Sequence, residues 1–229
     1  MNLLAFDTST EYLSLAIQKD EDVFTFDVNA GQTHSQIILP QIKALLNRAE
    51  ITLADLQGIA FGVGPGSFTG VRIAAGVAQG LGYGANLPVV GVCTLQALAE
   101  TSGAQKVIAC LDARMGEVYF AAYEKMAEQW QEVIAPSLHN PDAVPVVEGD
   151  NWVSVGSGWQ TYAEQLRDFY GAKLLAELPQ LLPNASAILK LALPVFLAGN
   201  AKPAAEAQPI YIRNRVALKT TERKQGLRL

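Results

Sequence analysis

The sequence predicts an α/β protein made of two subdomains, each with a mixed β-sheet. An apolar strand ending in aspartate, followed by a turn and a second strand, occurs twice, at residues 3–18 and 106–123. Short apolar strands also alternate with segments of helical period through both halves. A repeat of this kind indicates an internal duplication. We therefore expect subdomains at residues 1–100 and 101–212, followed by a basic tail at 213–229 that is partly disordered.

The first half should contain five strands and three helices. Its strands are apolar or alternate in polarity, and the first helix begins near Thr33, with Ile38, Ile42 and Leu45 on one side. Pro40 lies early in that helix, where it would bend rather than abolish it. The expected elements are strands at 3–6, 12–18, 23–28, 58–63 and 88–92, which include one hairpin pair, and helices at 33–49, 69–84 and 94–100.

The stretch from Val63 to Arg72 joins a buried strand to the longest helix. Gly64-Pro65-Gly66 forms a sharp turn, and Ser67 or Thr69 is placed to cap the helix. A glycine-rich turn between a strand and a helix also cradles phosphate in other proteins. This stretch lacks the Gly-Lys-Ser/Thr ending of a P-loop and the spacing of a dinucleotide fingerprint. We interpret it as a structural turn, and phosphate binding stays open as the alternative.

The helix expected at 69–84 carries Arg72 as its sole charge. A helix that is apolar on all sides is normally buried on all sides. Small residues recur at every fourth position, which would let another backbone approach closely. Either one side meets the sheet and the other a second subunit, or the helix lies in the centre of the core. The small residues are Gly66, Gly70, Ala74, Ala78 and Gly82.

The second half repeats the order of elements. A turn near 113–117 separates its first two strands, and Gly156-Ser157-Gly158 should open a helix that runs to about residue 170. Two such subdomains make up the actin-like, sugar-kinase and Hsp70-like nucleotide-binding folds. In those folds, strand-ending aspartates and hairpin turns face a cleft for phosphate and Mg²⁺. The expected elements are strands at 106–112, 118–123, 132–134 and 152–155, and helices at 156–170 and 184–198.

Composition limits the class of protein further. The net charge of −5 argues against a broad nucleic-acid surface, yet six of the 17 lysines and arginines follow residue 209. The two cysteines, Cys93 and Cys110, form neither a disulfide framework nor a metal-ligand spacing. The N-terminus lacks the basic and apolar regions of a signal peptide. We expect a cytoplasmic protein that does not enter a membrane.

Five segments in order along the chain resemble the TsaB (YeaZ) family. They are 4–10, 34–35, 64–73, 112–119 and 211–213, and the segments Gly64–Ile73 and Asp112–Tyr119 are together the most specific. The resemblance implies an actin-like fold and a role in making threonylcarbamoyladenosine at position 37 of tRNAs that read ANN codons. It also implies a non-catalytic subunit that binds the catalytic subunit TsaD and, with it, the ATPase TsaE. Alone, such a chain is expected to form a homodimer, and to meet tRNA through the complex.

The residues themselves agree with a non-catalytic role. The catalytic relative holds its metal with two histidines four positions apart on one helix. This chain has only His34 and His139, and Ile38 stands where the second ligand would be. We therefore expect no catalytic site, metal site or cofactor of its own, although an Mg-nucleotide at the TsaD interface stays open. The alternative is an ATPase or phosphotransferase that uses Asp7 and Asp112 with Mg²⁺.

The expected site residues fall into three groups. A partner should dock on the two helices of the first half, so that Ala75→Glu or Gly76→Arg would abolish binding and leave the monomer folded. A vestigial nucleotide cleft would contain Asp7, Thr8, Ser9 and Asp112, and a self-capped turn is the alternative there. The partner residues are His34, Ile38, Gln41, Leu45, Val71, Arg72, Ala75, Gly76, Gln79 and Tyr83; possible tRNA contacts are Arg213, Arg215, Lys219, Arg223 and Lys224.

Overall fold

The computed structural model describes residues 1–213 as two five-stranded mixed sheets of the same topology. In the first sheet, β1 is antiparallel to β2 and parallel to β4; in the second, β6 is antiparallel to β7 and parallel to β9. The strand orders, β3-β2-β1-β4-β5 and β8-β7-β6-β9-β10, match position by position. The duplicated two-subdomain α/β fold is therefore confirmed. The strands are β1 Leu3–Asp7, β2 Tyr12–Lys19, β3 Asp22–Asn29, β4 Gly58–Gly64, β5 Val89–Cys93, β6 Lys106–Arg114, β7 Glu117–Met126, β8 Gln129–His139, β9 Trp152–Val155 and β10 Leu174–Leu178.

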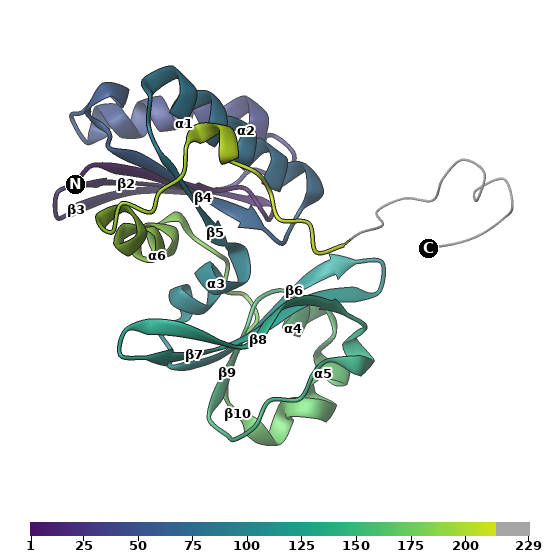
Figure 1. Cartoon of the computed structure of the whole chain (residues 1–229). Helices are drawn as coiled ribbons and strands as arrows, with labels where there is room; N and C mark the ends of the chain where they lie inside the picture. Colours follow the sequence, from purple (N-terminus) through teal and green to yellow (C-terminus); the bar gives the residue numbers. More distant parts are fainter. Residues whose placement is uncertain (214–229) are drawn as a thin grey trace, which may run out of the picture.

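Helices separate and cover the two sheets (Figure 1). Helices α1 and α2 pack on the outer face of the first sheet, and α6 packs on its other face. Helix α3 packs on the second sheet, whose far face is covered by α4 and α5. In the described residues, no helix has the length and hydropathy needed to cross a membrane. The helices are α1 His34–Arg48, α2 Phe68–Ala85, α3 Thr94–Ser102, α4 Gly158–Thr161, α5 Ala163–Tyr170 and α6 Ala185–Leu197.

The expected boundary of the second subdomain, 101–212, is wrong at its C-terminal end. The apolar face of α6 packs against the first sheet, where Ile188 and Phe196 join Leu3 and Ala60 in one cluster. A residue beyond α6, Lys202, then pairs with Val89 at the edge of β5. The chain thus returns to the first subdomain after the second sheet is complete. Helix α6 returns because its apolar face must be buried. The order of elements along the sequence does not show which of the two sheets it packs against.

Three elements of the second half differ from the prediction. Strand β8 is longer than the expected 132–134, and β10 was missed because its Leu-Leu-Ala-Glu-Leu sequence also suits a helix. β10 forms as an edge strand beside β9. The expected helix at 156–170 is divided into α4 and α5, because Tyr162 leaves the helical region at φ −122° and ψ 39°.

Candidate functional site

Asp7 ends β1 and is buried beneath the strand-to-helix turn of β4 and α2. The amide and hydroxyl of Ser9 both donate to Asp7 Oδ1, at 2.9 and 2.7 Å. Oδ2 faces Gly62, where a Cβ would overlap it, and Oδ2 has no hydrogen-bond partner in residues 1–213. This geometry is a self-capped turn around a carboxylate that is enclosed by the protein.

The enclosure of Asp7 predicts a pH-dependent stability. Burial raises the pKa of Asp7 from 3.8 to about 6, against the opposing hydrogen bonds from Ser9. As pH rises, the unfolded chain loses this proton first, so the folded state loses stability between about pH 4 and 6. For this shift the loss amounts to about 3 kcal/mol and persists at higher pH.

We expect Asp7→Asn to remove that dependence, because the amide does not titrate. The measurement is urea unfolding of both proteins at pH 4 and at pH 7. The free energy of unfolding of the native chain should fall by up to about 3 kcal/mol relative to the variant over this range. Parallel pH profiles would contradict the burial of an ionisable Asp7.

The loop after Asp7 is packed directly against the Gly64–Gly70 turn. The Thr8 hydroxyl donates to the carbonyl oxygen of Gly70 at 2.7 Å, and the amide of Ser67 donates to the carbonyl oxygen of Ser9 at 2.7 Å. Ser67 Oγ accepts from the Gly70 amide and caps α2. Donors that would hold a phosphate in a P-loop are thus used to join the two loops. The geometry favours a structural turn.

Asp112 lies on β6, at the second hairpin, and is held by its own turn. Asp112 Oδ1 accepts from the Arg114 amide at 2.8 Å, and Oδ2 pairs with the Arg114 guanidinium at 3.2 Å. No hydrogen bond or ion pair within residues 1–213 joins Asp7 to Asp112. Within the same residues, no group of three His, Cys, Asp or Glu side chains is placed to hold a metal ion.

A C-terminal segment at 210–213, here called the strap, connects the two subdomains (Figure 1). The amide of Ile210 donates to the carbonyl oxygen of Val63 at 2.8 Å. Arg72 Nε donates to Tyr211 Oη at 2.8 Å, and Arg213 donates to Glu117 and to the carbonyl oxygen of Arg114. The strap therefore runs from the start of α2 to the β6–β7 turn. Of the expected tRNA contacts, only Arg213 lies in the described residues, and its side chain is mostly buried in this contact.

Half of the expected partner residues are unavailable as surface contacts, which corrects the sequence-based prediction. They lie on the inner faces of α1 and α2 because those faces cover the first sheet. His34 is one of them, and its Nε2 donates to the carbonyl oxygen of Tyr12 at 3.1 Å. Gln41 is half-buried. The buried residues are His34, Ile38, Leu45, Val71 and Ala75; the exposed ones are Arg72, Gly76, Gln79 and Tyr83.

The outer face of α2 is exposed and almost uncharged, with Arg72 as its one charged residue. A Cβ at Gly76, Gly80 or Gly84 would meet nothing within 4 Å, and Tyr83 is 75% exposed. By contrast, the small residues at every fourth position face inward. A Cβ at Gly70 would overlap the carbonyl oxygen of Thr8, and one at Gly82 would lie 2.7 Å from the Cβ of Ala204. The close approach predicted from that pattern is therefore made by this chain's own backbone.

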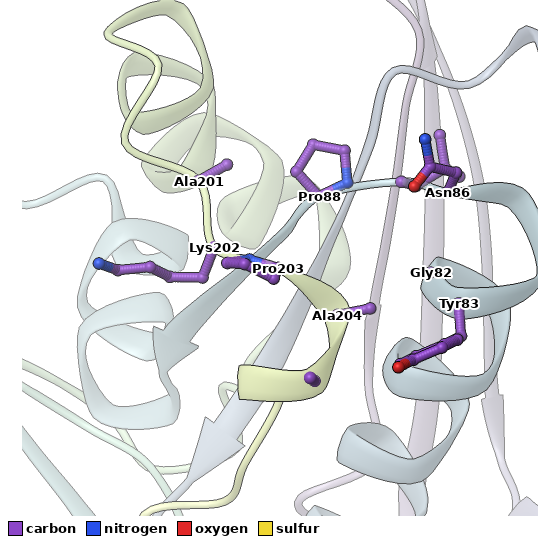
Figure 2. Close-up of a pocket in the computed structure, with 10 residues that line it drawn as sticks. Gly82, Tyr83, Asn86, Pro88, Ala201, Lys202, Pro203 and Ala204 are labelled. Carbon is purple, nitrogen blue, oxygen red and sulfur yellow. The ribbon is translucent and has the colours of Figure 1, made fainter.

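A groove of about 560 Å³ continues this face at the end of α2 (Figure 2). Tyr83 and Asn86 form one wall, and Pro88, Lys202 and Pro203 lie across from them. Sequence reasoning missed this groove because its far wall is the segment that returns after α6. The segment is fixed there by the pairing of Val89 with Lys202.

Comparison with known proteins places the chain among close relatives. It is 37% identical over 235 residues to the tRNA threonylcarbamoyladenosine biosynthesis protein TsaB of Escherichia coli, covering 98% of this chain and all of that protein. The TsaB protein of Haemophilus influenzae is 39% identical over 232 residues, covering 96% of each chain. The chain belongs to the TsaB family. The solved structure of YeaZ from Pseudomonas aeruginosa has a TM-score of 0.85 at 36% identity, over 92% of this chain and 99% of that one.

One family model extends the relationship beyond TsaB. Residues 28–176 match the model of TsaD, described as tRNA N6-adenosine threonylcarbamoyltransferase. The match includes α1, α2 and most of the second sheet. The TsaB-family chain therefore shares the TsaD-type actin-like fold.

Proposed function

We propose that this chain is a non-catalytic, cytoplasmic subunit in the biosynthesis of threonylcarbamoyladenosine on tRNA, and that it acts by binding a TsaD-type threonylcarbamoyltransferase. The name shared by its relatives gives the pathway. The enclosed carboxylate of Asp7 and the ion-paired Asp112 support the absence of an ATPase site and of a cofactor of its own.

The outer face of α2 is the observation that carries the proposal. Gly76 and Gly80 present bare backbone, and Tyr83 adds a large exposed ring. An uncharged face of this kind is typical of a surface that a partner covers. Tyrosine is also enriched among the residues that dominate binding energy at interfaces. The same face would close a homodimer when the catalytic subunit is absent, and a TsaE-type ATPase would join the assembled pair.

Gly76→Arg should prevent the association without unfolding the chain. A side chain at position 76 points away from this protein, so the fold has room for it. An arginine there would stand between α2 and the docked partner. We expect binding of the TsaD-type subunit to weaken at least tenfold, measured by light scattering on mixtures of the two proteins.

Gln160→Arg is the matched control, because it adds the same charge at an exposed position of α4, on the second sheet's far side. It should bind the partner as the native chain does. A Gly76→Arg variant that still binds with native affinity would rule out this face. If the native chain does not bind the TsaD-type subunit, the proposed function is ruled out.

A further inference from the structure

An exposed patch lies where the strap meets α2 and the β6–β7 turn. Four large apolar side chains of this strap patch are open to solvent: Phe68 at 41%, Met115 at 54%, Ile210 at 51% and Tyr211 at 48% exposed. The strap patch adjoins the glycine face of α2, because Arg72 precedes Gly76 by four residues on the same side of the helix. Its other members include residues from two segments that are distant in sequence. Its full membership is Phe68, Arg72, Arg114, Met115, Ile210 and Tyr211.

Arg72 lies over the ring of Phe68 and beside the ring of Tyr211 in the strap patch. Its Cζ lies 3.6 Å from the ring centre of Phe68 and 5.5 Å from that of Tyr211. Its Nε donates to Tyr211 Oη, whereas its Nη atoms have no hydrogen-bond partner in residues 1–213. The guanidinium is therefore held in one orientation before any ligand binds. Its two Nη groups are available to donate hydrogen bonds to an anion. Arginine presents such groups to phosphate oxygens in a fixed fork.

The charge of the strap patch is opposite to that of the protein as a whole. Its two neighbouring carboxylates, Asp112 and Glu117, are paired with Arg114 and Arg213. Arg114 itself is 82% exposed, so it can meet a second anion. The sequence that follows, 214–229, holds five basic residues and one acid, in a chain of net charge −5. Within the described residues, Arg72, Arg114 and Arg213 outnumber the two carboxylates, so this surface is net positive.

We propose that the strap patch is an RNA-binding surface of this chain. Arginines would contact the phosphate backbone, and Phe68 and Tyr211 would stack with unpaired bases, which is how single-stranded RNA is commonly held. An acidic peptide would also suit arginines, but it gives no role to the exposed rings that flank them. The identity of the RNA as tRNA rests on the proposed function.

The test is fluorescence anisotropy of the full chain with an unmodified tRNA that reads an ANN codon, over a range of salt concentrations. Arg114→Asn removes one charge, and asparagine tolerates the φ of +63° at this position. We expect affinity to fall about three- to tenfold, and the slope of log K against log salt to become shallower by about 0.7–0.9. Tyr211→Ala should weaken binding by a similar factor, because it removes a stacking ring and frees Arg72.

Arg167→Gln is the matched control, since Arg167 is also exposed but lies on α5 in an ion pair with Glu177. It should bind tRNA as the native chain does. Native affinity in both patch variants would overturn the proposal, and so would an equal loss in Arg167→Gln. Binding that depends only on Lys219, Arg223 and Lys224, tested by changing all three to glutamine, would overturn it as well.

Light scattering with the TsaD-type subunit separates this inference from the proposed function. Arg114→Asn lies off the α2 face and should leave that association unchanged. If Arg114→Asn instead weakens partner binding and leaves tRNA affinity intact, the strap patch is a protein-docking surface and the RNA proposal is overturned. If tRNA binding fails while the partner still binds, only the inference is lost.

Discussion

Gly70→Ala is expected to unfold the first subdomain or destabilise it severely. Gly70 lies in the first turn of α2, where its backbone touches the loop after β1. A Cβ would overlap the carbonyl oxygen of Thr8, and the Thr8 hydroxyl already donates to the carbonyl oxygen of Gly70. The helix would have to move away from β1 and break that bond. We expect a loss of about 3–5 kcal/mol in the free energy of unfolding, measured by urea denaturation.

Gly76→Ala is the matched control for that experiment. It makes the same chemical change in the same helix, but its Cβ meets nothing within 4 Å. Alanine is the better helix former by about 1 kcal/mol, so this variant should be slightly more stable than the native chain. If the two variants proved equally stable, α2 could not be packed against the loop after Asp7 as described.

These two glycines show what the sequence could predict about α2. The recurrence of small residues at every fourth position correctly indicated a close backbone approach. The pattern does not identify the approaching backbone, and here Gly70 and Gly82 meet segments of the same chain. The proposed partner face follows Gly76, Gly80 and Gly84 instead, which have the same spacing on the other, exposed side of the helix. Which of these two rows of small residues faces inward can be seen only from the packing of α2 on the first sheet.

The fold was largely predictable because its signals are local. An apolar strand that ends in aspartate, a turn and a second strand define each repeated unit within about 20 residues. The strap could not be predicted, because Arg72 and Tyr211 are 139 positions apart and their contact depends on the path of the chain after α6. The return of α6 to the first sheet has the same cause. An apolar helix after the second subdomain has two sheets against which it could be buried.

The candidate site was predicted less well, because burial and binding use the same residue types. Ile38 and Leu45 fit the apolar side of α1, and that side turned out to cover the sheet. His34 likewise donates to a backbone carbonyl inside the protein. The exposed apolar residues of the strap patch were missed, since Phe68 and Met115 have no periodic pattern that would mark them as surface residues.

Ala75→Glu is expected to unfold the monomer, in contrast to the outcome predicted from sequence. Ala75 is 5% exposed and belongs to the core cluster between α2 and the first sheet. Glutamate would bring a larger side chain and a carboxylate into that cluster, where the described residues offer it no cation. Burying an unpaired charge costs several kcal/mol, which is a large share of the roughly 5–15 kcal/mol that stabilises a typical domain. Circular dichroism and urea denaturation would measure the loss.

Gly76→Glu is the control that turns this expectation into a test of helix orientation. It places the same side chain one position further along α2, where a Cβ has open space. That variant should fold normally, and it should lose affinity for the TsaD-type subunit because its charge stands on the docking face. A folded Ala75→Glu monomer would mean that position 75 faces solvent. The inner and outer faces of α2 would then have to be exchanged, and the docking face with them.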